Sequence, residues 1–255
     1  MTLQACAEIV RRGDPDRFRV AMAAPLTARA RLLPLFAFNV EVARAPWVSS
    51  EPMIAEMRLQ WWRDVLAEIV EGGKTRRHEV AEPLAEVLSP ADARALDALV
   101  LARRWDAYRE PFADQAALER HIEASAATLL VVAARVLGAR SGLSTLHELG
   151  YAMGLANWLI AVPKLEELGR IPLIDGRPEA VSALARAGAE RLARVRAARD
   201  VIPAAAIPAA RMAWRADPVL RRAAQSPERV AAGRLEVSES ARRAAFLWRA
   251  MAGRW

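Results

Sequence analysis

Apolar side chains recur three or four positions apart along much of the chain, the spacing that places them on one face of an α-helix. The clearest case is residues 52–71, in which Ile54, Met57, Trp61, Val65 and Ile69 keep this spacing. Two glycines follow the segment, as is typical of a helix end. The pattern predicts a long helix whose apolar stripe packs against a core.

Capping residues and prolines divide the rest of the chain into further predicted helices. Their expected starts are Asp14–Pro15, Thr27, Ser50–Pro52, Ser89–Asp92, Asp114 and Ser144. The helix from Ser144 is expected to end at Pro163, and later prolines should break the remainder into three or four shorter helices. Residues 125–136 are small or apolar on nearly every side, which predicts a helix in the middle of a bundle.

Composition favours helices over strands. Alanine and arginine, both strong helix formers, are abundant, whereas aromatic residues make up only 6% of the chain. Hydrophobic residues reach 54% and charged residues 26%, a balance typical of a soluble globular protein. Because no repeat or linker interrupts the 255 residues, we predict an all-α, single-domain helical bundle over residues 1–255.

Positive charge is concentrated in the C-terminal third. The formal net charge is +7, and residues 186–255 contain 15 arginines against six acidic residues. From about residue 178 onward we therefore expect a basic helical part that contacts an acidic protein partner or an anionic membrane surface. No nucleic-acid-binding motif accompanies the charge, so we expect no nucleic-acid partner.

The sequence also predicts where the protein resides. The single cysteine, Cys6, cannot form an internal disulfide, which favours a reducing compartment. No signal peptide is apparent, and no apolar stretch reaches the ~18 residues that a membrane span requires. We expect a cytoplasmic protein that can also lie peripherally at the inner membrane.

Motif inspection finds no catalytic site. The three histidines, His78, His121 and His147, are too far apart to suggest a metal site, and we interpret them as core or surface residues. Neither a P-loop, a nucleophile elbow nor a dinucleotide-binding glycine pattern occurs. No cofactor is expected on this basis.

Several stretches in fixed order nevertheless resemble one enzyme family. LLPLFAFNVEVARAPW is followed by RLQWWRDVL, HEVAEPLAEVL, ARRWDAYREPFADQAALERHIEASAATLLVVAARVLG and YAMGLANWLIAVPKLEELGRIPL. Together these stretches, over about residues 14–175, are similar to the squalene/phytoene synthase family. The resemblance implies the all-α isoprenoid synthase fold, whose enzymes join two prenyl diphosphates head to head with Mg²⁺ held by two aspartate-rich motifs.

At those two motifs the chain departs from the family pattern. Aligned with the family's YAFCRxxDDxxD, the sequence has Ala43, Arg44 and Trp47 where the aspartates belong. The second motif is shorter, lacks aspartate and contains Pro163. The resemblance thus implies loss of the magnesium-binding residues, as in the branch of the family that includes a mitochondrial complex I assembly factor.

A few residues remain as candidates for a site. Glu41, Glu166 and Glu167 lie near the altered motifs and are the only substitutes we identify for the missing aspartates. Arg58 and Asn157 correspond to positions near the family's cavity, and we name them as candidate substrate-binding residues.

Three functions stay open from the sequence. The first is a catalytically degenerate family member that acts as an assembly or scaffold factor for a respiratory membrane complex. The second is an active prenyl diphosphate head-to-head transferase that uses the substitute glutamates, and only this one requires Mg²⁺. The third is a protein that binds a prenyl lipid without converting it.

Overall fold

The computed structural model describes residues 3–49, 51–73, 75–252 and 255. All regular elements in these ranges are helices, which confirms the all-α prediction. The longer helices are α1 (Leu3–Gly13), α2 (Pro15–Met22), α3 (Leu26–Arg44), α4 (Pro52–Glu71), α5 (Ala81–Val87), α6 (Pro90–Ala102), α8 (Gln115–Ile122), α9 (Thr128–Val136), α10 (Leu143–Glu167), α11 (Pro178–Ala197), α13 (Ala216–Gln225) and α15 (Glu239–Met251). Shorter helical segments are α7 (Arg104–Ala107), α12 (Ile207–Ala210), α14 (Glu228–Ala231), η1 (Ala45–Trp47), η2 (Glu123–Ala127), η3 (Arg199–Val201), η4 (Ala204–Ala206) and η5 (Arg211–Ala213).

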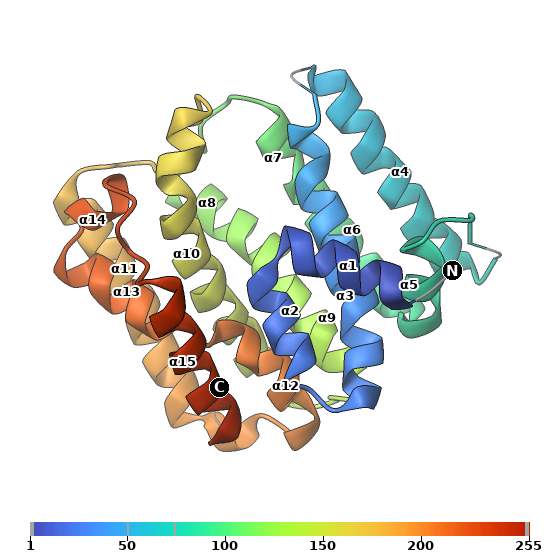
Figure 1. Ribbon diagram of the computed structural model, residues 1–255. Helices are drawn as coiled ribbons and strands as arrows, with labels where there is room; N and C mark the ends of the chain where they lie inside the picture. The colour runs from blue at the N-terminus through green and yellow to red at the C-terminus, as the bar shows by residue number, and fades with distance from the viewer. Residues whose placement is uncertain (1–2, 50, 74, 253–254) are drawn as a thin grey trace.

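Helices α9 and α10 occupy the centre of the bundle. Figure 1 shows them between the N-terminal helices α1 to α4 and the C-terminal helices α11, α13 and α15. Helix α10 packs against α9, η2, α11 and α13. Most residues of α9 are buried, as predicted for the apolar segment 125–136. The core therefore lies where the sequence has least polar surface.

Most predicted helix ends are found in the structure. The Asp14 and Asp114 carboxylates accept from the amides of Arg17 and Ala117 as N-caps, and Ser89 forms a capping box with Asp92. Gly72 ends α4 with φ of 70°, which a residue without Cβ adopts without strain. At α3 the cap is Pro25 rather than Thr27. Helix α4 begins at Pro52 as predicted, whereas Ser50 lies outside the described residues.

Two further predictions about helices are wrong. In α4 the buried side chains are Ala55, Leu59, Trp62, Val65, Leu66 and Ile69. Ile54 and Met57 of the predicted stripe are 36% and 68% exposed, because this helix packs through a neighbouring row of residues. Helix α10 also continues through Pro163 for a further turn to Glu167.

The C-terminal helix α15 has few apolar contacts with the rest of the protein. Phe246 is its only buried residue, and its ring lies 5.6 Å from that of Trp214. None of the helices in the described part of the chain is both long and apolar enough to cross a bilayer. Polar contacts, described below, supply much of the attachment of α15.

Candidate functional site

A cavity of about 320 Å³ opens between α3, α8, η2 and α10. Its wall combines apolar side chains, such as Ile122, Leu129 and Leu165, with charged side chains contributed by several elements. We call it the central cavity. It is the candidate functional site because polar groups from distant parts of the chain meet in it.

One wall of the central cavity is a π-helical turn, η2, between α8 and α9. The hydroxyl of Ser125 donates to the carbonyl of His121 at 2.7 Å. Gly154 of α10 faces this turn, and a Cβ there would lie 2.6 Å from side-chain carbons of Ala126 and Ile122. The glycine thus lets α10 approach η2 closely. Single π-helical turns such as η2 are often found at functional sites.

The positions aligned with the first aspartate motif lie on both sides of α3. Ala43 and Trp47 line the central cavity, whereas Arg44 lines a separate surface groove. The guanidinium of Arg170 stacks 5.3 Å above the ring of Trp47 and donates to the carbonyl of Asp106 at 2.6 Å. These contacts join η1, α7 and the segment that follows α10 at one end of the cavity.

The charged groups in the cavity wall do not suit Mg²⁺. Arg17, Arg103 and Arg215 line the cavity, and Asp106 is the one carboxylate among its described lining residues. Asp106 is 3% exposed and already paired with Arg103 at 3.3 Å. Since Mg²⁺ requires oxygen ligands and guanidinium groups repel it, these residues do not fit the metal. Across the described ranges no group of three or more His, Cys, Asp or Glu is placed to hold a metal.

Burial shifts the pKa of two side chains in this wall. Burial raises the pKa of Asp106 despite the nearby Arg103. It also lowers the pKa of His121 to about 3, and the positive charge of Arg103 adds to this effect. The His121 ring packs 5.1 Å from Trp158, and its Nε2 atom has no hydrogen-bond partner among the described residues. His121 is therefore neutral at physiological pH.

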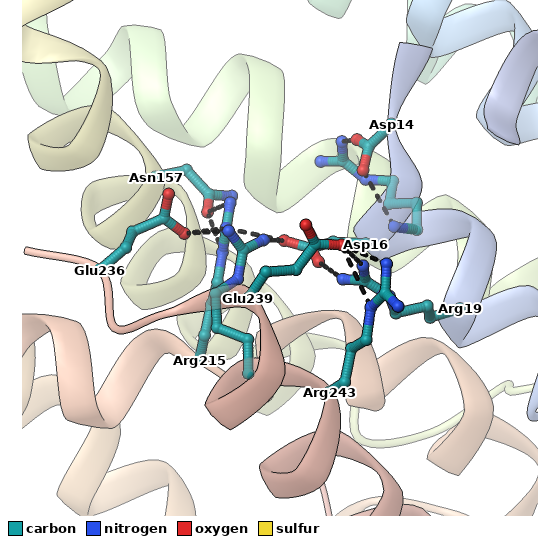
Figure 2. A network of polar contacts seen from close by, with 10 residues as sticks. Asp14, Asp16, Arg19, Asn157, Arg215, Glu236, Glu239 and Arg243 are labelled. Atoms are coloured by element: carbon teal, nitrogen blue, oxygen red, sulfur yellow. Dashed lines mark hydrogen bonds and ion pairs between the residues drawn. The ribbon is translucent and has the colours of Figure 1, made fainter. Parts of the chain in front are cut away.

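Asn157, predicted to bind substrate, lies in the cavity wall and is engaged by Arg215. Its Oδ1 accepts from Nε and Nη2 of Arg215 at 3.2 and 2.9 Å. Nη1 of Arg215 lies 2.7 Å from both Asp16 and Glu236, and Figure 2 shows the guanidinium between these three partners. The amide oxygen thus holds a structural arginine in place.

The same network attaches α15 to α2. Arg242 of α15 lies 2.6 Å from Asp16 and 3.1 Å from Glu236. Glu239, at the start of α15, lies 2.9 Å from Arg19 of α2 (Figure 2). Asp16 is therefore the carboxylate through which α2, the start of α13 and α15 are joined.

The other predicted site residues lie elsewhere. Glu41 and Arg58 line a surface groove of about 520 Å³ on the other side of α3, together with Trp61 and His78. Glu166 and Glu167 are exposed at the end of α10, where Glu167 pairs with Lys164 at 2.9 Å. The structure does not bring the three glutamates to one cavity, so it gives no support to a displaced magnesium site.

Four cavity residues were not predicted from the sequence: Arg17, Arg103, Asp106 and Arg215. Each is a charged residue near a helix end, where such residues usually face solvent. Arg17 and Arg103 pair with the nearby Asp14 and Asp106, whereas Arg215 is held by Asn157, which is far away along the chain. One feature of the sequence could have pointed to some of them: Arg103 and Asp106, like His121, fall within a stretch that resembles the family.

These features define the class of protein: an all-α bundle with a central cavity walled by facing helices. A solved structure of a dehydrosqualene synthase with ligand has this fold, with a TM-score of 0.76 and 15% identity over 98% of this chain and 95% of that chain. The profile of the squalene/phytoene synthase family matches residues 10–254. The chain belongs to that family.

Curated relatives in animals carry a different name. The chain is 31% identical over 169 residues to a Drosophila melanogaster protein named NADH dehydrogenase (ubiquinone) complex I, assembly factor 6 homolog, with 62% of this chain and 50% of that protein covered. It is 28% identical over 171 residues to the human assembly factor 6, with 62% and 48% covered. The chain thus spans about half the length of these relatives.

Proposed function

We propose that this chain is a non-catalytic member of the squalene/phytoene synthase family that assists assembly of a respiratory membrane complex. The observation that carries the proposal is the set of charged groups in the central cavity, where three arginines and Asn157 stand with one paired carboxylate. Such a wall cannot hold Mg²⁺ against a leaving diphosphate, because the ligating oxygens are missing. The names of the animal relatives supply the respiratory complex.

We further propose that the basic C-terminal part, from about residue 178, is the surface that meets a partner. Its arginines outnumber its acidic residues by more than two to one, whereas the rest of the chain is close to neutral. An acidic subunit or an anionic inner membrane surface would complement this charge. Peripheral attachment to the inner membrane follows from the same argument.

Binding of a prenyl lipid without turnover is the second candidate. The size of the central cavity, about 320 Å³, and its apolar side chains favour it. Farnesyl diphosphate added to the purified protein separates the alternatives. A lipid binder retains it without Mg²⁺, a transferase releases diphosphate when Mg²⁺ is present, and an assembly factor that works through its surface does neither.

The assembly role is tested in cells of the source organism that lack this chain. Native gel electrophoresis should show a decrease in fully assembled complex I and accumulation of partial complexes. Re-expression of the full chain should restore the assembled complex. A normal level of complex I in the deleted cells, with the full chain confirmed absent, would contradict the proposed function.

A further inference from the structure

A second hollow of the surface lies where the ends of α11 and α15 meet η3, η4 and the start of α13. Its volume is about 760 Å³, and none of its lining residues belongs to the central cavity. The residues that matter here are Arg196, Arg199, Asp200, Asp217, Trp248 and Arg249. We call it the Arg-Trp groove.

Three guanidinium groups from three different elements converge on the groove. The two carboxylates in its lining do not balance them. Asp217 is shared by Arg196 at 3.0 Å and by Arg221 at 2.9 Å. Asp200 and Arg199 are 3.8 Å apart with side chains 94% and 75% exposed, a pair of the kind that contributes little in water.

Arg249 has the least compensated charge of the three. It is half-buried and has no hydrogen bond or ion pair with any described residue. Burial and the positive charge of Arg196 both lower its pKa, and the negative charge of Asp217 offsets them only in part. Two like charges in a partly dry groove repel each other, and an anion placed between them would relieve this repulsion.

Beside these cations, α15 presents apolar side chains to solvent. Leu247, Trp248 and Met251 are 60%, 62% and 88% exposed. A helix that carries arginine next to exposed tryptophan and aliphatic residues has the composition of a segment that lies at a membrane interface. A small inorganic anion would bind to the arginines but would make no contact with the exposed side chains of Leu247, Trp248 and Met251.

We propose that the Arg-Trp groove binds the phosphate group of an anionic phospholipid, with Leu247, Trp248 and Met251 inserted among the neighbouring lipids. Phosphate oxygens accept hydrogen bonds from guanidinium groups in pairs, and Arg196, Arg199 and Arg249 all line this groove. The inference deepens the proposed function and rests on it only for the location of the chain at a membrane.

The test uses the full chain and vesicles of phosphatidylcholine with and without phosphatidylglycerol, read by co-sedimentation. Wild type should bind the phosphatidylglycerol vesicles and release them as salt is raised. The double variant Arg199→Gln with Arg249→Gln should bind at least about tenfold more weakly, since each arginine near an anionic surface raises the binding constant severalfold. The single variant Arg199→Glu, at a strongly exposed position, should show the same loss if the double variant is unstable.

The matched control is Arg186→Gln with Arg229→Gln. Both residues are exposed and outside the groove, so this protein loses the same net charge. It should bind within about twofold of wild type if the site is local rather than a general effect of charge. Equal losses in both double variants, or none in either, would overturn the inference.

Two further experiments distinguish binding of a lipid from binding of a free anion. One uses the double variant Leu247→Ser with Met251→Ser, and the other uses inorganic phosphate as a competitor. The serine variant should lose vesicle binding while keeping its fold by circular dichroism. Inorganic phosphate is also added to wild type bound to vesicles, with chloride at the same ionic strength as the control. If phosphate displaces the protein and chloride does not, the lipid assignment is overturned. Failure of vesicle binding alongside normal restoration of complex I in cells would reject the groove and leave the proposed function standing.

Discussion

Burial shifts the pKa of two side chains that line the central cavity, Asp106 and His121. His121 is neutral because its surroundings are apolar and Arg103 is close, and Asp106 is partly neutralised by the same arginine. These states could not be predicted from the sequence, which indicates only that His121 lies in a helix. The identity of Asn157 as a cavity residue was predictable from the family resemblance, but its bond to Arg215 was not.

The neutral state of His121 makes stability depend on pH. Since its pKa is about 3 in the folded protein and about 6.5 in an unfolded chain, the unfolded chain binds more protons between these values, and stability falls as pH falls. Between pH 7 and pH 5 we expect wild type to lose about 2 kcal/mol more than His121→Phe. Urea unfolding at the two pH values measures the difference.

The raised pKa of Asp106 does not affect this comparison of wild type with His121→Phe. Its raised pKa acts in the opposite direction, because the folded protein then holds the proton more tightly and loses stability as pH rises. This contribution is present in both proteins and cancels. Equal losses of stability in wild type and His121→Phe would show that His121 is not held neutral.

Gly154 sets the distance between α10 and η2. Substitution by valine would place carbons within 2.6 Å of Ala126 and Ile122, so neighbouring side chains or backbone must shift. We expect Gly154→Val to lower the free energy of unfolding by about 2 kcal/mol or more. Gly176→Val, where no atom lies within 4 Å of the added Cβ, is the matched control in urea unfolding. A similar stability for both variants would contradict the close approach.

At the scale of helices, local rules predicted more than packing rules did. Asp14, Ser89 and Asp114 begin helices and Gly72 ends one where expected, because a cap depends on a few adjacent residues. The core stripe of α4 was wrong, since two neighbouring rows of its surface are apolar and only the tertiary contacts choose between them. Pro163 was expected to end a helix that in fact continues past it.

Helix α15 depends on the carboxylate of Asp16 rather than on apolar burial. Asp16→Asn weakens its ion pairs with Arg215 and Arg242, so amide hydrogen exchange in residues 239–251 should become faster. Asp175→Asn removes a local surface pair with Arg177 and should leave exchange in α15 unchanged. Unchanged exchange in the Asp16 variant would mean that the other contacts of α15, those of Phe246, Arg242 with Glu236 and Glu239 with Arg19, hold the helix without Asp16.

At the scale of the whole molecule, the resemblance of a few ordered motifs was enough to predict the fold. The isoprenoid synthase architecture agrees with the dehydrosqualene synthase structure along nearly the full chain. The central cavity could not be predicted in the same way, because its charged and polar residues come from α2, α3, α7, α8, α10 and the start of α13. Only the packed bundle shows that three arginines and a single aspartate are among the described residues that line it.

We infer that the chain works through its surface and not through chemistry in the cavity. The most direct test is the amount of assembled complex I in cells that lack this chain and express Ala161→Leu, which fills the cavity from a partly exposed position of its wall. We predict that this variant restores assembled complex I to the wild-type level on native gels. Failure to restore it, with the variant folded and expressed normally, would contradict the account and show that the cavity itself is used.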